Sequence, residues 1–190
     1  MVDSINCVTS YKKFSFTDQM LKRVWDESSR IQIYNGSRRG RNANFVGLLG
    51  EKIVHSWLKD NQVNSVCENQ IEHDIKAGNH RIEVKTKDRT VDPLPHYEAS
   101  VPQYVYEAQS PDFYFFVSLK RDRNVRKVWY RTFREGFLLG YLSRSEFNQV
   151  KYSEKRGYKS NGAYFFCDAW NCKISDLREP NDILNGLKAA

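Results

Sequence analysis

Two carboxylates within residues 71–87 have the spacing of a metal site. The dipeptide Gly78-Asn79 separates two runs of alternating apolar and polar residues, which predicts a β-hairpin closed by a two-residue turn. In the register that this turn imposes, Asp74 lies directly opposite Glu83, with Cβ atoms about 4.5–5.5 Å apart. Opposed carboxylates repel each other unless a cation lies between them, and Mg²⁺ usually needs only one or two protein carboxylates. The hairpin therefore predicts a divalent-metal site.

The two faces of this predicted hairpin differ in chemistry. Because side chains alternate across a strand, one face would carry the charged residues and the other mainly apolar ones. The charged face would hold Glu72, Asp74, Glu83, Lys85 and Lys87, and the other face Ile71, His73, Ile75, Ile82, Val84 and Thr86. The alternative is an ordinary solvated face, in which Glu72 and Lys85 form a cross-strand ion pair.

A third carboxylate, Glu51, lies in a segment with helical periodicity. Apolar residues recur at three- and four-residue intervals over residues 44–58, which predicts an amphipathic helix capped by Asn42 or Asn44. Helical geometry places Glu51 at the edge of the apolar stripe rather than on the polar face. A carboxylate in that position needs a partner, either within a functional site or as an ion pair with a nearby lysine.

These features, in this order, resemble the PD-(D/E)XK nuclease superfamily, which has the restriction-endonuclease-like fold. The motif reads Asp74, eight intervening residues, and then Glu83-Val84-Lys85. The preceding helix supplies the extra acidic residue that is usual in this superfamily. His73 replaces the proline of the motif, a change that many members tolerate.

The resemblance implies an α/β fold with a restriction-endonuclease-like core of αβββαβ order, in which helices flank a mixed central sheet. It covers residues 42–119, and we expect residues 42–190 to form a PD-(D/E)XK nuclease-like domain. Residues 1–41 would add an arm or cover made of a helix, predicted over residues 16–30, and a basic loop.

The resemblance also implies a metal-dependent endonuclease that hydrolyses DNA phosphodiester bonds with Mg²⁺, for which Mn²⁺ can substitute. Asp74 and Glu83 would bind the metal together with the backbone carbonyl of Val84. Lys85 would orient or help to deprotonate the attacking water and would stabilise the transition state. Glu51 would bind the metal through water, hold a second metal or orient a ligand.

The charge balance points to an anionic partner. The chain has 30 Lys and Arg residues against 23 Asp and Glu, a formal net charge of +7, and its pI is about 9.2. Such a surplus attracts nucleic acid, so we expect DNA as the partner, with RNA and a homodimer as open alternatives. The expected backbone contacts are Arg38, Arg39, Arg41, Lys87, Arg89, Arg121 and Arg123, although basic loops are also commonly just solvated surface. The competing function is a non-catalytic nucleic-acid-binding protein on the same scaffold.

The composition excludes several classes of protein. Hydrophobic residues make up 40% of the chain and aromatic residues 14%, which excludes a disordered basic chain. No apolar run approaches eighteen residues, and the first eleven residues lack the apolar core of a secretory signal, so no membrane association is expected. Four cysteines are too few for a disulfide scaffold. We therefore expect a soluble, cytoplasmic protein with reduced thiols.

The rest of the chain predicts further strands and helices. The apolar run of residues 113–119 is typical of a strand buried on both faces, and residues 143–146 fit a capping box that opens a brief helix. A helix is expected over residues 101–109, where Gln103 and Tyr106 are weaker site candidates. The other expected elements are strands over residues 128–133, 163–167 and 171–174, and a short helix or turn over residues 136–142.

Overall fold

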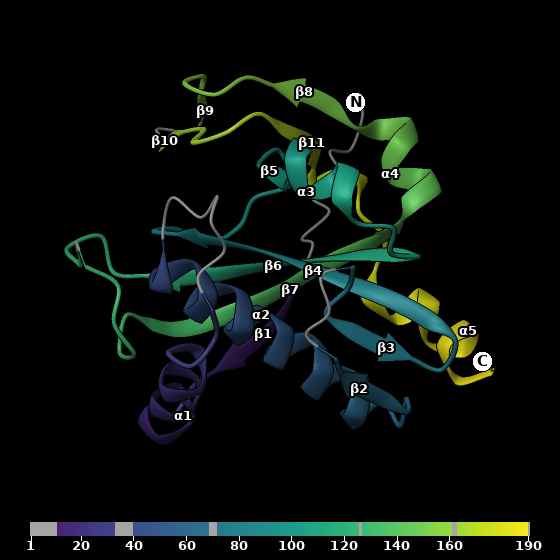
Figure 1. The fold of residues 1–190 in the computed structure, drawn as a ribbon, viewed down its shortest axis with the longest axis horizontal. Helices are drawn as coiled ribbons and strands as arrows, with labels where there is room; N and C mark the ends of the chain where they lie inside the picture. Colours follow the sequence, from purple (N-terminus) through teal and green to yellow (C-terminus); the bar gives the residue numbers. More distant parts are fainter. Residues whose placement is uncertain (1–10, 33–39, 69–71, 126, 161–162, 190) are drawn as a thin grey trace, which may run out of the picture.

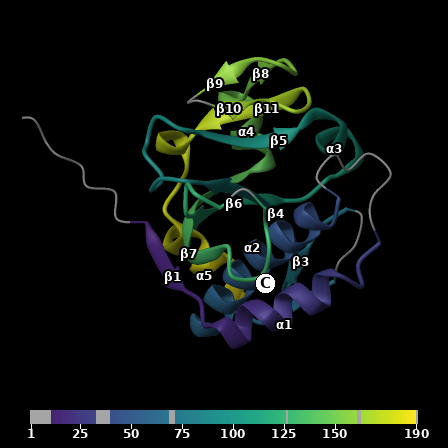
Figure 2. The ribbon, with the colours of Figure 1, turned by 90° about the vertical axis from the view of Figure 1, so that its left-hand side faces the viewer.

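A six-stranded mixed sheet lies between a layer of two helices and a smaller three-stranded sheet (Figures 1 and 2). The structure is a computed structural model, and it describes residues 11–32, 40–68, 72–125, 127–160 and 163–189. The strands of the central sheet are β1 (Lys12–Ser15), β2 (Ser65–Cys67), β3 (Ile75–Ala77), β4 (His80–Arg89), β6 (Phe113–Arg121) and β7 (Phe133–Ser143).

The central sheet has the order β1-β7-β6-β4-β3-β2. All neighbouring strands are antiparallel except β4 and β6, which are parallel. The predicted hairpin is confirmed in β3 and β4, where Ile75 pairs with Ile82. Gly78 has a φ of 57°, a left-handed conformation that glycine adopts without strain and that tight hairpin turns require. The predicted mixed sheet flanked by helices is thus confirmed.

Helices α1 (Asp18–Ser28) and α2 (Arg41–Asp60) cover one face of this sheet. The side chain of Thr17 caps α1 by accepting a hydrogen bond from the backbone of Met20 at 3.2 Å. Helix α2 begins after Gly40 without a side-chain cap, so the prediction of an Asn42 or Asn44 cap is wrong. The apolar face of α2 packs on the sheet in the larger of two hydrophobic clusters.

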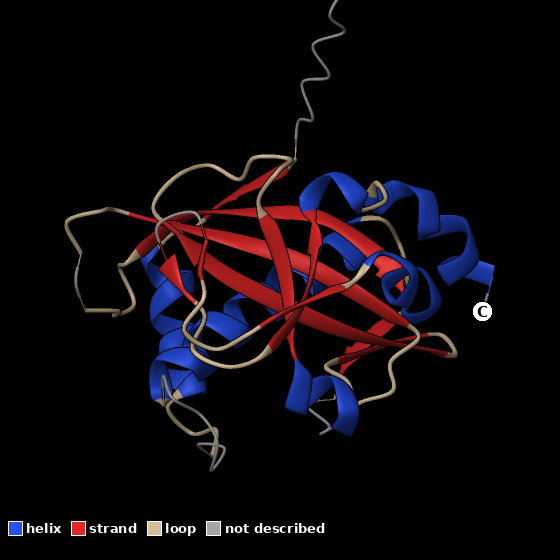
Figure 3. Cartoon of the chain, turned by 90° about the horizontal axis from the view of Figure 1, so that it is seen from above, coloured by secondary structure: helices blue, strands red, loops and turns tan. Residues whose placement is uncertain are grey.

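The second layer lies on the opposite face of the central sheet (Figure 2). It consists of the antiparallel strands β5 (Glu98–Pro102), β11 (Ala169–Lys173) and β8 (Tyr152–Glu154), in the order β5-β11-β8. A second hydrophobic cluster fills the space between the two sheets. The long strands of the central sheet twist beneath this layer when it is viewed from above (Figure 3). The remaining elements are α3 (Gln103–Ala108), α4 (Arg144–Val150), β9 (Lys159–Ser160), β10 (Ala163–Tyr164), η1 (Ile174–Asp176), η2 (Pro180–Ile183) and α5 (Leu184–Ala189).

Most of the predicted elements are present, and two regions differ. The strand expected over residues 163–167 is limited to β10 and is followed by a bend at residues 166–167. The expected helices over residues 16–30, 44–58 and 101–109, the buried strand β6, and the capping box of α4 are all observed with shifted ends. Residues 128–132, however, form turns and bends instead of a strand, and residues 136–142 belong to strand β7 instead of a helix or turn. Among the described residues, no helix has both the length and the apolar character needed to cross a membrane.

Candidate metal and catalytic site

Asp74 lies one residue before the start of β3, just beyond the last residue pair in the β3–β4 register. Its backbone N–H donates to the carbonyl of Ile82 at 3.0 Å, and its Oδ2 accepts the backbone N–H of Val84 at 2.8 Å. The described β3–β4 register runs only from Ala77–His80 to Ile75–Ile82, so the expected Asp74–Glu83 strand pair is not formed. The carboxylate of Asp74 thus accepts a hydrogen bond from the backbone of β4, and this bond anchors Asp74 against the strand.

Glu83 and Lys85 occupy the face of β4 that looks away from α2. Ile82 and Val84, which alternate with them, belong to the cluster beneath α2, whereas Glu83 pairs in register with Tyr114 of the second cluster. Glu83 is only 3% exposed. The ammonium of Lys85 donates to Glu83 Oε1 at 2.5 Å. The predicted alternation of apolar and charged residues along this strand is therefore confirmed.

Gly50 brings Glu51 to the edge of β4. A Cβ atom at Gly50 would overlap the side-chain hydroxyl of Thr86, so only glycine lets the α2 backbone approach β4 this closely. The next residue on α2 is Glu51, whose Oε2 is buried and lacks a hydrogen-bond partner among the described residues. Helix packing thus positions this carboxylate beside the strand that carries Glu83.

The three carboxylates influence one another electrostatically. Burial, reinforced by the negative charge of Glu83, raises the pKa of Glu51 to about 7. Burial also raises the pKa of Asp74 well above its usual value, and the charges of Glu83 and Glu51 raise it further. Lys85 opposes both shifts. The structure thus brings together all four residues for which catalysis was expected.

This cluster has the chemistry of a site for a hard divalent cation. The buried Oε2 atoms of Glu51 and Glu83 have no hydrogen-bond partner in the described part of the chain, and buried carboxylates are stable only when they are paired or neutralised. Within the described ranges, no group of three or more His, Cys, Asp or Glu side chains is placed so that it could hold a metal ion. Mg²⁺, however, takes one or two carboxylates and completes its shell with water and phosphate. The residues present fit such an ion.

Sequence reasoning missed Gln109, which contributes to this site. Its side-chain oxygen accepts a hydrogen bond from Lys85 at 3.2 Å. The weaker candidates bond elsewhere: Gln103 donates to Ser153 at 2.8 Å, and Tyr106 bonds to a residue of α4. Gln109 directly follows α3. The only feature of the sequence that could have indicated its role is its position at the end of the segment predicted as a helix.

The described members of the expected nucleic-acid contacts lie on α2, on β4, and at and after the end of β6. Arg41 is exposed at the first position of α2, and Arg123 is exposed in the turn after β6. Arg121 is partly buried and lies 3.4 Å from a carboxylate oxygen of Asp88. Arg38 and Arg39 lie outside the described residues.

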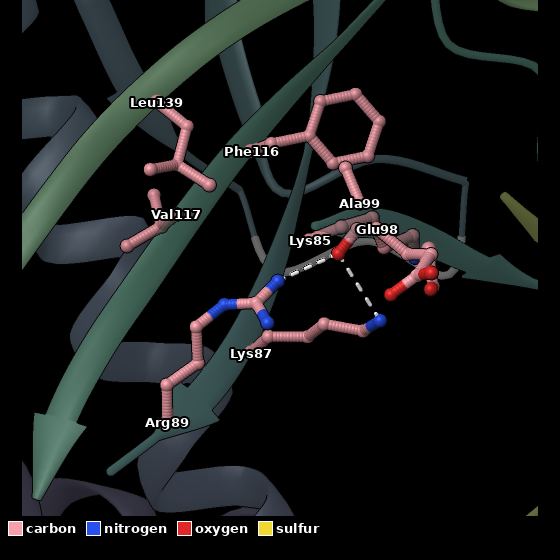
Figure 4. A pocket seen from close by; sticks show the side chains of 9 residues that line it. Lys85, Lys87, Arg89, Glu98, Ala99, Phe116, Val117 and Leu139 are labelled. Atoms are coloured by element: carbon pink, nitrogen blue, oxygen red, sulfur yellow. Dashed lines mark hydrogen bonds between the residues drawn. The ribbon is translucent and has the colours of Figure 1, made fainter. Parts of the chain in front are cut away.

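Lys87 and Arg89 lie between the two sheets (Figure 4). Both side chains donate to the backbone carbonyl of Glu98 on β5, Lys87 at 3.2 Å and Arg89 at 2.6 Å. Burial, reinforced by the charge of Arg89, lowers the pKa of Lys87 to about 7. Lys87 and Arg89 therefore do not face outward as expected for phosphate contacts. Side chains alternate along β4, and those of Lys87 and Arg89 point toward the second layer.

Comparisons with known proteins gave no match. A scan against protein-family models matched none, and searches of curated proteins and of solved structures likewise found none. The inference of function therefore rests on the residues and their arrangement.

Proposed function

We propose that this protein is a metal-dependent endonuclease of the PD-(D/E)XK superfamily, which hydrolyses phosphodiester bonds in DNA. The observation that carries the proposal is the ion pair of buried Glu83 with Lys85, whose charges act on both Asp74 and Glu51. Glu51 comes from α2, Asp74 from the start of β3, and Glu83 and Lys85 from β4. A structural ion pair needs only one carboxylate for one lysine, so the two additional carboxylates, Glu51 and Asp74, point to a cation.

The order of the elements also supports the proposal. Helix α2, strands β2, β3 and β4, helix α3 and strand β6 follow one another in the αβββαβ order that the resemblance implies, with β5 inserted before α3. Strands β2, β3 and β4 form an antiparallel meander, and β6 is parallel to β4. Glu51 lies on the helix, Asp74 lies just before β3, and Glu83 lies on β4.

Asp74 and Glu83 would hold Mg²⁺ or Mn²⁺, with the carbonyl of Val84 as a further oxygen ligand and Glu51 joining directly or through water. The ion would supply a nucleophilic water at neutral pH and would neutralise charge on the phosphate oxygens. The hydrogen bond from Val84 N–H to Asp74 already fixes one of these carboxylates relative to β4.

Lys85 would act on the attacking water and on the phosphate. Its ammonium is held between Glu83 and Gln109, so it needs little reorganisation to point a positive charge at the reacting group. When the phosphate is bound, Lys85 would orient the water and stabilise the negative charge that develops on the non-bridging oxygens. Gln109 would keep the lysine in place.

Divalent-dependent cleavage of DNA tests this proposal. We expect supercoiled plasmid to be nicked or linearised with Mg²⁺ and to stay intact with EDTA. Asp74→Asn, Glu83→Gln and Lys85→Met should each reduce the rate at least about 100-fold, because each removes a group that acts in the transition state. Glu72→Gln is the matched control, since Glu72 is an exposed acid of the same hairpin and should keep wild-type activity.

Calorimetry with Mg²⁺ separates the proposal from its alternative. The wild-type chain should take up the ion, and Asp74→Asn should not. A chain that binds DNA in a salt-sensitive way but neither takes up Mg²⁺ nor cleaves would contradict catalysis. That result would establish a non-catalytic nucleic-acid-binding protein instead.

A further inference from the structure

A hairpin beside the second sheet exposes aromatic rings that the proposed catalytic site does not use. Strands β9 and β10 pair Lys159 with Tyr164. Pairing continues toward the base of the hairpin, where the N–H of Phe165 donates to the carbonyl of Tyr158 at 3.0 Å. Opposite residues of antiparallel strands share a face, and successive residues alternate. The hairpin therefore has two faces of different character.

The inner face of this hairpin packs on the molecule. The hydroxyl of Ser160 donates to the side chain of Glu98 on β5 at 2.7 Å. The ring of Phe165 lies 5.2 Å from the ammonium of Lys87 on β4, a cation–π contact. Lys87 shares its face of β4 with Glu83 and Lys85, so the hairpin is held on the same side of the central sheet as the candidate catalytic lysine.

Two aromatic rings, one on this hairpin and one in the bend that follows it, are exposed beside a lysine. Tyr164 is 59% exposed and Phe166 is 64% exposed, which are among the largest values for apolar residues of the described chain. The ammonium of Lys159 lies 5.7 Å from the ring of Tyr164. Exposed apolar patches that are surrounded by polar residues commonly mark interaction sites.

The charge around these rings favours an anionic partner. Lys155, Arg156 and Lys159 line the first arm of the hairpin, whereas the second arm carries one acid, Asp168. Asp168 accepts hydrogen bonds from the Lys155 ammonium and the Arg156 backbone, each at 2.9 Å, and so closes the base of the hairpin. The hairpin thus combines exposed flat rings with more basic than acidic side chains among these residues.

Single-stranded nucleic acid has the matching chemistry. Its phosphates are negative, and its unpaired bases expose flat faces that stack on aromatic side chains, whereas a duplex hides those faces. Tyr164 lies in β10, and Phe166 lies two residues later, in the bend that follows this strand. Rings so placed can receive bases from one strand.

We infer that the exposed rings of Tyr164 and Phe166, together with Lys159, bind single-stranded DNA by base stacking at the β9–β10 hairpin. The hairpin holds an unpaired strand on the side of β4 that carries Glu83 and Lys85. This inference deepens the proposed function and rests on it for the nature of the substrate, which becomes DNA with a single-stranded region.

Fluorescence anisotropy in EDTA tests the inference without cleavage. The probes are a fluorescein-labelled strand of twenty thymidines and a labelled duplex of twenty base pairs. Tyr164→Ala and Phe166→Ala should each weaken binding of the single strand at least fivefold, because each stacked base is worth about 1–3 kcal/mol. Binding of the duplex should change less than twofold. Tyr164→Phe and Phe166→Tyr keep a ring and should retain wild-type affinity.

The control is Val66→Ala, which removes another highly exposed apolar side chain, on the edge strand β2. It should not alter binding, and all variants should melt within about 2 °C of the wild type. Unchanged single-strand affinity in the double alanine variant would overturn the inference. An equal loss for duplex and single strand, or wild-type binding to anionic phosphatidylserine vesicles but not to the single strand, would also overturn it. A chain that binds single strands through this hairpin and cleaves no DNA would overturn only the proposed function.

Discussion

Glu51 has a buried carboxylate oxygen, and the negative charge of Glu83 acts on it. Burial is the largest cause of its raised pKa, and Glu83 adds to it. A carboxyl with a pKa of about 7 is half protonated at neutral pH, so it can exchange its proton for a cation. Binding of a divalent ion to this cluster should therefore release protons near pH 7.

The raised pKa of Glu51 predicts how stability depends on pH. Between its ordinary value of 4.5 and about 7, the folded chain holds a proton that the unfolded chain has lost. The free energy of unfolding in EDTA should thus fall as pH rises through this window. Glu51→Gln removes the effect, so its advantage over the wild type should grow from pH 5 to pH 8 by up to about 3 kcal/mol.

Urea unfolding at pH 5, 6, 7 and 8 measures this difference. Addition of Mg²⁺ at pH 8 should restore the stability of the wild type and leave Glu51→Gln less affected, because the ion replaces the proton. A constant difference between the two proteins across these pH values would show that Glu51 does not carry a raised pKa.

The contact of helix α2 with strand β4 positions the site at the level of elements. Gly50→Ala would drive a methyl group into Thr86, so the helix must move away from the strand, and overpacking of this kind costs about 1–3 kcal/mol. Gly47→Ala is the matched control on the same helix, because its new Cβ would meet only Glu51 Oε1 at 3.9 Å. Alanine should stabilise a helix interior there by up to about 1 kcal/mol.

Thermal melting of the two variants compares these effects, and Mg²⁺ affinity reports whether Glu51 has moved. Gly50→Ala should lower both the melting temperature and the affinity, and adding Thr86→Ala should recover part of each. If Gly50→Ala melts like the wild type, the close approach of α2 and β4 is not what positions the carboxylate.

The elements that sequence reasoning could predict are those whose signals are local. Gly78-Asn79 fixes a two-residue turn, and the turn fixes the register of β3 and β4. Strand β7 could not be predicted, because Gly136 resembles a turn residue in the sequence. In the fold it lies where side chains from distant segments converge: an added Cβ would lie 2.6 Å from Ile53 Cδ1 and 2.8 Å from Phe16 Cζ. Glycine serves there for tertiary packing, which no neighbouring residue reveals.

Some features of the candidate site could likewise be predicted from the sequence, and others could not. The proximity of Asp74 to β4 follows from the hairpin, and the edge position of Glu51 follows from helical periodicity. That the Asp74 carboxylate accepts the N–H of Val84 depends on where β3 ends. That Gln109 reaches Lys85 depends on how α3 packs. Both are tertiary outcomes, and neither is encoded in the spacing of the residues.

At the scale of the whole molecule, an acidic cluster lies within a chain of net charge +7. Part of the positive charge is neutralised locally; for example, Arg131 and Arg134 both pair with Asp18. Under the proposed function, the remaining surplus would attract DNA, whereas the acidic cluster would repel any phosphate that reaches the site until a cation neutralises it. Affinity for DNA should therefore depend on divalent ions even without cleavage.

Removal of the repelling charges should make that dependence disappear. In EDTA, the double variant Asp74→Asn/Glu83→Gln should bind DNA roughly tenfold more tightly than the wild type, since each charge a few ångströms from a phosphate is worth on the order of 1 kcal/mol in water. Ca²⁺, offered in place of Mg²⁺, should tighten binding by the wild type and not by the variant. Glu72→Gln, which removes an exposed charge from the same hairpin, should shift the affinity much less.

Titrations at 50 and 200 mM salt distinguish the two contributions, because the general attraction weakens with salt and the repulsion within the partly buried site is screened less. Equal affinities of wild type and double variant in EDTA would mean that the phosphate does not approach this cluster, and the catalytic site would then have to lie elsewhere.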